Sequence, residues 1–333
     1  MDYTNTSIRK YSRRNWLALT ALAVVSILLG CSLETPSKQN TKVKIGYLPI
    51  AAGLPLFVAV ERGFFAKSGF DVELVRFASS NDLGTAATAG QVQALMPFAL
   101  NAGFDIGVVS GKRHQLFGYN LYSDKNPHIV DYLVVRKYSN IQTLADLKGR
   151  RVAGFPGSVT KVFVENILKK HGVEPKDYSY FELSPKDWLA ALESGSVDAA
   201  SVMEPQASLI ISKGVGRVIV EGFFAKLMPD VPLSGHWLSS QFVEKEGVES
   251  AKRFVGAFDK AINFIRENPE QAKGYYVKYI GVEQQSLATI QLNDWKTLTE
   301  FDPAKVQAFA DLLSDVKAIQ QRVNVKQYIL QTP

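Results

Sequence analysis

Short hydrophobic runs alternate with longer amphipathic segments through most of the chain, and glycine or proline residues separate them. In the first part of this pattern, helices are predicted over residues 56–67 and from the polar group 79–82 to Gly90. The hydrophobic runs expected to form strands lie at residues 43–48, 72–77, 93–97 and 104–109. Alternation of strands and helices indicates a mostly parallel sheet flanked by helices.

The same alternation starts again after about residue 130. Helices are predicted to begin at residues 157–160, at the pair Ser184-Pro185 and at Pro205, because serine is a good helix cap and proline suits a first helical turn. The strands expected here lie at residues 132–136, 151–154, 178–183, 198–203 and 217–220. The chain therefore contains a second α/β unit.

Beyond about residue 248 the pattern becomes purely helical. Apolar residues recur there at helical spacing, first in the stripe Phe254, Phe258, Ile262 and Ile265. A second stripe contains Val306, Phe309, Leu313, Val316 and Ile319. The predicted fold is thus two α/β lobes with a helical C-terminal tail, and a cleft between two lobes is a common place for a small ligand.

The N-terminus has the features of an export signal. Basic residues at positions 9–14 precede an uncharged stretch, residues 16–30, that is too short to span a bilayer, which takes about 20 apolar residues. This stretch ends in Leu-Leu-Gly before Cys31 and resembles the lipobox of bacterial lipoproteins. We therefore expect a signal peptide over residues 1–30, a lipid on Cys31 and a flexible tether over residues 31–42.

Two questions at the N-terminus stay open. Cys31 could instead be a buried cysteine, and the pair Arg13-Arg14 also resembles a twin-arginine signal, so the export route is undecided. Cys31 is the single cysteine of the chain, so a lipidated domain would have no thiol. The net charge of +6 falls to +3 once the four basic residues and one acidic residue of the leader are removed. No basic run with aromatic residues remains, which argues against nucleic acid as a partner.

No catalytic or metal-binding constellation is evident, and neither a catalytic role nor a cofactor is predicted. The chain has no nucleophile elbow and no phosphate-binding glycine loop. The four histidines lack short metal-ligand spacing; they are His114, His128, His171 and His236. The candidate chemistry lies instead in polar residues at two predicted helix starts, 79–81 and 157–160, where free N–H groups suit an anionic or polar ligand. The competing interpretation is plain helix capping.

Five segments together resemble the periplasmic binding proteins for nitrate, sulfonates, taurine and thiamine precursors. The first three are KIGYLP at 44–49, PLFVAVERGFFAK at 55–67 and GFDVELV at 69–75. The other two are LADLKGRRV at 144–152 and GSVDAASVMEP at 195–205. The resemblance implies a type II periplasmic-binding-protein fold, in which two lobes close on a solute by hinge bending.

The same resemblance implies the lobe boundaries and the pocket. Lobe 1 would contain residues 43–128 and 233–333, and lobe 2 residues 129–232, with crossings near 124–132 and 229–237. Hydroxyl and N–H groups would hold the polar end of the solute, while Phe98 and Trp237 would pack on its apolar part. The implied ligand-binding residues are Leu54, Ser79, Ser80, Asn81, Phe98, Ser158, Val159, Thr160, Glu204, His236 and Trp237. Trp237 could instead pack at the hinge, and Glu204 could hold the turn before Pro205.

The expected function is that of an exported, lipid-anchored solute-binding protein of an ABC importer, facing the periplasm or the cell exterior. It would act as a monomer and deliver a small sulfonate-, nitrate- or taurine-type solute to a permease and its ATPase. No arginine falls at an implied pocket position, although arginine suits sulfonates best. A neutral heteroaromatic solute, such as a thiamine pyrimidine or riboflavin, is therefore a second hypothesis. A biosynthetic enzyme for thiamine pyrimidine or menaquinone on the same fold is a third, and a sensory role is a fourth.

Overall fold

The computed structural model describes residues 40–331 of the 333-residue chain. The predicted signal peptide, Cys31 and nearly all of the tether lie outside these residues. Within the described part, none of the helices combines the length and the apolar character needed to cross a bilayer.

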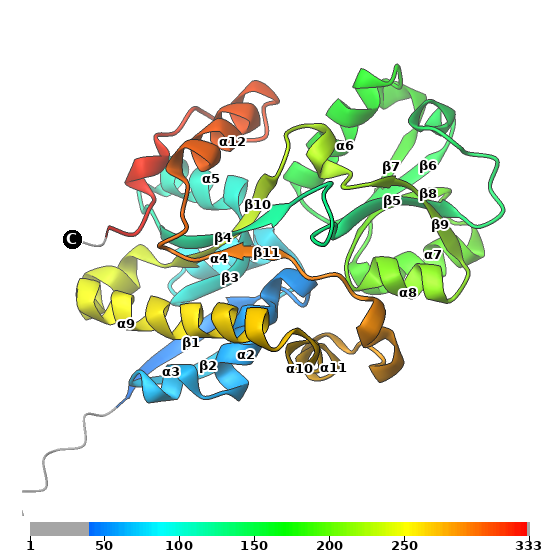
Figure 1. The fold of residues 1–333 in the computed structure, drawn as a ribbon. Helices are drawn as coiled ribbons and strands as arrows, with labels where there is room; N and C mark the ends of the chain where they lie inside the picture. The colour runs from blue at the N-terminus through cyan, green and yellow to red at the C-terminus, as the bar shows by residue number, and fades with distance from the viewer. Residues whose placement is uncertain (1–39, 332–333) are drawn as a thin grey trace, which may run out of the picture. The chain divides into compact units, whose positions relative to one another are not determined.

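The larger of two sheets has six strands in the order β11-β4-β10-β3-β1-β2 (Figure 1). Four of them run in the same direction, while β10 and β11 run the opposite way. The strands are β1 (Thr41–Tyr47), β2 (Phe70–Arg76), β3 (Ala94–Ala99), β4 (Gln115–Tyr122), β10 (Val231–Leu238) and β11 (Asp294–Lys296). We call this sheet and the helices packed on it lobe 1.

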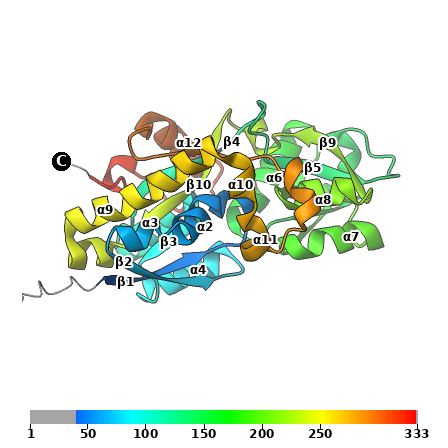
Figure 2. The ribbon, with the colours of Figure 1, turned by 60° about the horizontal axis from the view of Figure 1, so that its bottom comes forward.

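Helices cover both faces of the larger sheet. One face carries α2 (Leu54–Glu61), α3 (Phe64–Lys67) and α9 (Ser240–Glu267), which lie side by side in Figure 2 and share one hydrophobic cluster. The other face carries α4 (Ser80–Thr88), α5 (Leu100–Ser110) and α12 (Pro303–Asp315). Two short helices, α10 (Pro269–Lys273) and α11 (Tyr275–Ile280), follow α9. The sheet is thus buried between two apolar layers.

The smaller sheet has five strands in the order β7-β6-β8-β5-β9. Only β5 runs against the other four strands. The strands are β5 (Asp131–Arg136), β6 (Arg151–Gly154), β7 (Ser179–Glu182), β8 (Ala199–Met203) and β9 (Gly216–Glu221), with the helices α6 (Ser158–Lys170), α7 (Trp188–Ser194) and α8 (Gln206–Ser212). We call this sheet with its helices lobe 2.

The two-lobed α/β fold predicted from the sequence is confirmed. The chain passes between the two sheets twice, once between β4 and β5 and once between β9 and β10. One hydrophobic cluster includes residues of both sheets. At its centre Phe163 of α6 packs edge-on against Phe224 at 5.8 Å and Phe309 of α12 at 5.9 Å between ring centroids. Lobe 2 therefore contacts the C-terminal helix of lobe 1 directly.

Two predictions about elements are wrong. Residues 104–109 belong to helix α5, not to a strand. Gly103 and Gly107 in this segment are not turn residues, since each lies within the helix and packs against an aromatic ring. A Cβ at Gly103 would lie 2.5 Å from the Trp237 ring, and one at Gly107 would lie 2.5 Å from the Tyr328 ring. The C-terminal tail is also not purely helical, because residues 294–296 form β11 and pair with β4.

Candidate functional site

A small cavity of about 50 Å³ lies between the two lobes. Its wall comes from the segments that follow β1, β2, β3 and β6 and from residues of β3, β4, β8 and β10. The lining residues are Leu48, Ile50, Ser80, Asn81, Pro97, Ala99, Asn101, Ala102, Tyr122, Phe155, Pro156, Gly157, Val159, Thr160, Met203, Leu233 and Ser234. At roughly 10–15 Å³ of such space per water, the cavity holds only a few small molecules or groups. The lobes are thus nearly closed on each other.

The first wall is the start of helix α4. Ser79 is its N-cap, and the Ser79 hydroxyl accepts a hydrogen bond from the backbone N–H of Asp82 at 3.2 Å and donates to the Asp82 carboxylate at 2.8 Å. Ser80 and Asn81, which follow, line the cavity. The structure therefore brings two of the three predicted polar residues, Ser80 and Asn81, to the cavity. The third, Ser79, caps the helix instead.

The second wall is the start of helix α6 in lobe 2. Its N-cap is Gly157, whose φ of 133° lies in a region that favours glycine, and no side chain caps this helix. The N–H groups of the first turn of a helix have no partner within the helix. Val159 and Thr160 line the cavity and Ser158 is the first residue of α6. The predicted group 157–160 thus lies at the cavity.

The third wall, which the sequence analysis missed, is the start of helix α5. Its N-cap is Ala99, again without a side-chain hydrogen bond, and Ala99, Asn101 and Ala102 line the cavity. Nothing in the sequence marks this helix start, because it lacks a Ser, Thr, Asp or Pro signal and begins with Leu100. Three helix N-termini, from both lobes, therefore converge on one cavity.

The floor of the cavity consists of strand residues that were also missed. Tyr122 of β4 and Leu233 and Ser234 of β10 line it. Behind Ser234 lies Asn120, which donates from Nδ2 to the Ser234 hydroxyl at 2.9 Å, and His236 Nε2 lies 3.0 Å from Asn120 Oδ1. Polar groups thus continue from the cavity into the interior of lobe 1.

The electrostatics of the cavity come from the backbone. Among the described residues that line it, none is an Asp, Glu, Lys, Arg or His. The N-terminus of a helix carries roughly half a positive charge and free N–H donors. A group with several acceptor oxygens fits such a wall. Apolar side chains, among them Ile50, Phe155 and Met203, form much of the remaining surface and suit a short apolar part of the same solute.

Leu54 and Phe98 lie in the hydrophobic interior of lobe 1 and not in the cavity wall. Leu54 begins α2 and is fully buried in the cluster beneath α9. The Phe98 ring is also buried and lies against Gly84 of α4. Phe98 thereby supports α4, which carries the lining residues Ser80 and Asn81.

His236 and Trp237 are likewise inside lobe 1. The His236 ring lies 4.5 Å from Phe258 and 6.1 Å from Phe117 between ring centroids, and Trp237 packs edge-on against Phe104 at 5.8 Å. Neither residue lines the cavity. The prediction that Trp237 packs on the solute fails on this placement, because α5, unrecognised in the sequence, covers the indole.

Glu204 lies beside the cavity-lining Met203 but takes part in a contact between the lobes. Its carboxylate accepts hydrogen bonds from the Ser208 hydroxyl at 2.9 Å and the Ser208 N–H at 3.3 Å. The Ser208 hydroxyl also lies 3.0 Å from the carbonyl oxygen of Thr289, in the segment that follows α11, so its single proton is shared between these two acceptors. Burial raises the pKa of Glu204 to about 7.

An open groove leads to the cavity from outside. It lies between α4 and α5, has a volume of about 640 Å³ and shares Ser80, Asn81, Asn101 and Ala102 with the cavity wall. The groove and the cavity therefore meet at the starts of two helices, α4 and α5.

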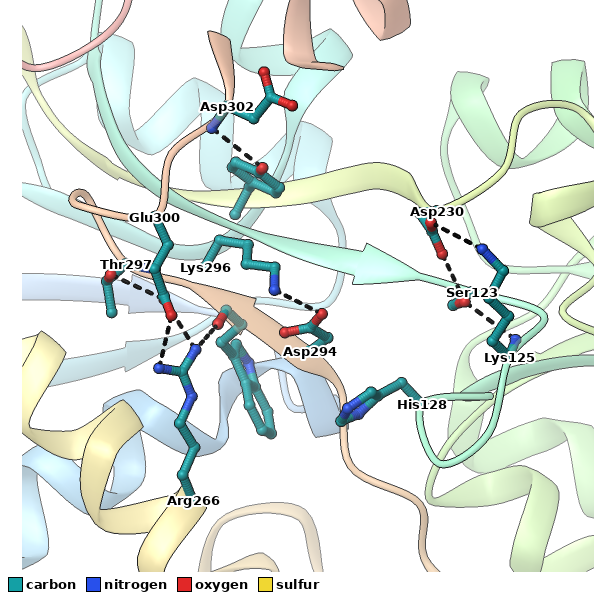
Figure 3. A network of polar contacts seen from close by, with 12 residues as sticks. Ser123, Lys125, His128, Asp230, Arg266, Asp294, Lys296, Thr297, Glu300 and Asp302 are labelled. Carbon is teal, nitrogen blue, oxygen red and sulfur yellow. Dashed lines mark hydrogen bonds and ion pairs between the residues drawn. The ribbon is translucent and has the colours of Figure 1, made fainter. Parts of the chain in front are cut away.

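The two segments that connect the lobes are tied to each other (Figure 3). Ser123, after β4, donates to the Asp230 carboxylate at 2.7 Å, and Lys125 Nζ lies 3.6 Å from the same carboxylate. Asp230 immediately precedes β10, and its hydrogen bond with Ser123 and the charge of Lys125 lower its pKa. A second ion pair joins Lys226 and Asp124 at 3.4 Å. These contacts tie together the two segments that cross between the lobes.

The chain is similar to known proteins in both sequence and structure. The sequence pattern of the NMT1-like family matches residues 37–279. A "Putative aliphatic sulfonates-binding protein" of Bacillus subtilis (strain 168) is 26% identical over 322 residues, 93% of this chain and 93% of that protein. The alkanesulfonate-binding protein SsuA of Xanthomonas axonopodis pv. citri, in a structure bound to MOPS, is 20% identical with a TM-score of 0.70, covering 87% of this chain and 98% of that one.

The fold also occurs in an enzyme. The desulfurization enzyme DSZB superposes with a TM-score of 0.66 at 17% identity, over 87% of this chain and 96% of that one. At such identity the likeness concerns the fold alone. Among the described residues of this chain, no group of three or more His, Cys, Asp or Glu side chains is placed to hold a metal ion.

Proposed function

The chain belongs to the NMT1-like family, and on this premise we propose that it is an exported solute-binding lipoprotein of an ABC importer. Its solute is a small organic sulfonate or a similar oxyanion with a short apolar part. One observation carries this proposal: three helix N-termini from two lobes meet at a cavity whose described lining residues carry no charge. N–H groups at helix starts bind anions without a counter-charged side chain.

The apolar wall supports an organic solute over a bare inorganic anion. Apolar residues of both lobes, Ile50 and Leu233 from lobe 1 and Phe155 and Met203 from lobe 2, face the same space as the helix starts. The sulfonate-binding relatives suit this division into a polar head and an apolar body. Nitrate has no apolar part and is expected to bind more weakly than an alkanesulfonate.

Capture follows from the arrangement of the lobes. The solute enters between α4 and α5, and lobe 2 then closes over it and brings the start of α6 to its head group. The connecting segments bend at the Ser123–Asp230 hinge. The closed form docks on a permease, and a lipid on Cys31 keeps the domain near that permease and so raises its local concentration. This delivery role is that of a monomeric carrier.

A second candidate solute is a neutral heteroaromatic compound, such as a pyrimidine or riboflavin. The lack of Lys and Arg among the described lining residues favours it, since a neutral ring needs hydrogen bonds and apolar contact but no positive charge. An enzyme on this fold is the other class of function that the fold permits. The described part of the wall offers hydrogen-bond donors but no acidic or basic side chain, which favours binding over catalysis.

Thermal unfolding with a panel of solutes tests the proposal. The protein, purified from cells that express the full chain, is melted with methanesulfonate, ethanesulfonate, nitrate, a thiamine pyrimidine and riboflavin. At about 100 times Kd a solute adds about 2.7 kcal/mol to stability, which raises Tm by roughly 4–5 °C in a protein of this size. We expect this shift with the two alkanesulfonates. A shift only with the pyrimidine or riboflavin would establish the second candidate, and no shift with any solute would refute a binding role for this cavity.

A further inference from the structure

Four polar side chains form a continuous hydrogen-bonded line from the interior of lobe 1 to the cavity. We call His236, Asn120, Ser234 and Tyr122 the relay. His236 and Asn120 are fully buried, and Ser234 and Tyr122 are 7% and 2% exposed and line the cavity. The contacts run from His236 Nε2 to Asn120 Oδ1 at 3.0 Å, from Asn120 Nδ2 to Ser234 Oγ at 2.9 Å, and from Ser234 to the Tyr122 hydroxyl.

The positions of the protons in this line follow from its inner end. Burial lowers the pKa of His236 to about 3, so the ring is neutral and carries a single N–H. Among the described residues Nδ1 has no hydrogen-bond partner, whereas Nε2 faces Asn120. If the proton were on Nδ1, two acceptors, Nε2 and Asn120 Oδ1, would face each other at 3.0 Å and a buried donor would also be left unpaired, at a cost of about 1–3 kcal/mol. The proton is therefore on Nε2 and points at Asn120 Oδ1.

This position of the proton on His236 constrains the hydrogen bonds of Asn120, Ser234 and Tyr122 in turn. Asn120 Oδ1 accepts from His236, so its amide group Nδ2 faces Ser234 and can only donate. Ser234 Oγ accepts that hydrogen bond, and its own proton must point away from Asn120, toward Tyr122 or into the cavity. If Ser234 donates to Tyr122, the phenolic proton of Tyr122 is in turn left for the cavity. Either way, the line ends in an O–H group that faces the solute.

We propose that the relay holds one hydroxyl of the Ser234–Tyr122 pair as a hydrogen-bond donor to the solute and so makes the cavity floor selective for head groups that only accept. This proposal rests on the proposed function and adds to it a selectivity among the head groups of solutes. The helix starts on the other walls also donate, so a head group that only accepts can use all of these donors at once, whereas an N–H or O–H on the head takes the place of one accepted hydrogen bond. Sulfonate oxygens meet that requirement, while a sulfonamide of the same size does not. Ser234 and Tyr122 contact the solute, and Asn120 and His236 are positioning residues.

Paired probes measure the selectivity. Methanesulfonate and methanesulfonamide have nearly the same shape, and calorimetry gives their affinity ratio for each variant. We expect the double substitution Ser234→Ala with Tyr122→Phe, which removes the terminal O–H whichever residue carries it, to weaken methanesulfonate binding about tenfold or more, the effect of one lost hydrogen bond to a charged group, with a much smaller effect on methanesulfonamide. His236→Gln keeps an N–H near the position of Nε2 and should retain the ratio. His236→Leu frees the Asn120 amide to turn over and should lower the ratio.

A matched control comes from another buried histidine of lobe 1. His114 is 2% exposed and accepts from the Ser240 N–H outside the relay, so His114→Leu should lower stability without changing the affinity ratio. If His236→Gln and His236→Leu lower the ratio equally, or if His114→Leu lowers it as much as His236→Leu, the proposal is wrong.

Nitrogen NMR on ¹⁵N-histidine-labelled protein tests the relay without any ligand. The spectrum of His236, assigned by its loss in His236→Gln, should show Nε2 protonated and Nδ1 bare from pH 5 to 8. A proton on Nδ1 would overturn the relay even if alkanesulfonates bind. Conversely, an Nε2 proton with no binding of either probe leaves the relay in place and refutes the proposed function, so the two failures are distinguishable.

Discussion

Gly103 and Gly107 of α5 show how single residues decide the packing of lobe 1. Each glycine lies under an aromatic ring, Trp237 over Gly103 and Tyr328 over Gly107. The Tyr328 hydroxyl also donates to the Phe104 carbonyl at 3.2 Å. These contacts fix α5 on the sheet and thereby fix the helix start that lines the cavity.

Gly103→Ala is therefore expected to destabilise the protein. The added Cβ would lie 2.5 to 2.9 Å from three atoms of the buried Trp237 ring, so the ring or the helix must move. Overpacking of this kind costs about 1–3 kcal/mol. Urea unfolding followed by tryptophan fluorescence measures it.

The control for this substitution is another helical glycine. Gly256 lies within α9 and an added Cβ would meet nothing within 4 Å. Gly256→Ala should raise the free energy of unfolding by about 0.5–1 kcal/mol, the ordinary helix preference of alanine over glycine. Equal effects of the two substitutions would disprove the packing role of Gly103.

At the scale of elements, helix α6 is the part of lobe 2 that is presented to the solute. Its two ends differ. Gly157, the N-cap, lines the cavity, whereas Gly172 follows the C-terminal end, where an added Cβ would meet nothing within 4 Å. Both glycines have positive φ, 133° and 76°, so an alanine at either position strains the backbone. Only at Gly157 does that strain displace N–H groups that face the cavity.

Gly157→Ala should thus weaken alkanesulfonate binding, while Gly172→Ala should leave it intact. Both variants should lose stability by an amount on the order of 1 kcal/mol, the cost of a side chain at positive φ. We expect at least a tenfold loss of methanesulfonate affinity for Gly157→Ala in calorimetry, since several N–H donors move together. A similar affinity loss in Gly172→Ala would mean that α6 acts through stability alone.

The sequence predicted the elements whose ends carry strong local signals. Ser79 caps α4 and proline or serine precedes several lobe 2 helices, so these starts were found. Helix α5 has no cap signal at Ala99 and contains two glycines, and it was therefore mistaken for a strand. Strands β4 and β10 were missed because buried polar residues, Asn120 in one and Ser234 in the other, interrupt their hydrophobic pattern.

The same cause explains which part of the candidate site could be predicted. Ser80, Asn81, Val159 and Thr160 were identified because they stand at recognisable helix starts. Tyr122 and Ser234 come from strands that lie far from them in the sequence and meet them only through the pairing of β4 with β10. The hydrogen-bond partner of a buried polar residue is set by tertiary contacts and not by spacing along the sequence. The contact of His236 with Asn120 is an example.

For the whole molecule, the contact between the lobes contains an ionisable group. Glu204 of lobe 2 is 3% exposed, and through Ser208 it is linked to the Thr289 carbonyl next to α11. The nearby ion pair of Lys213 and Glu283, at 3.4 Å, joins the same two parts of the chain. Protonation of Glu204 is thus coupled to the stability of this contact between the lobes.

This coupling predicts that Glu204→Gln stabilises the protein more at pH 8 than at pH 5. Burial raises the pKa of Glu204 from 4.5 to about 7. The folded state therefore retains the proton longer, and the stability gained from it is complete below pH 4.5 and lost as the pH rises through 7. A shift of this size corresponds to about 3 kcal/mol at most. Glutamine is neutral at both pH values, so the difference in Tm between variant and wild type should grow with pH.

Other buried groups make the comparison with wild type necessary. Burial also raises the pKa of Asp131 to about 7, which acts in the same direction, while the lowered pKa values of His114 and His236 act in the opposite direction below pH 6.5. These contributions are shared by wild type and Glu204→Gln and cancel in the difference. Glu193→Gln, at an exposed position of α7, should show no such growth. A difference in Tm that is the same at pH 5 and pH 8 would mean that Glu204 is charged in the folded protein at both, and the contact between the lobes would then be an ionic one.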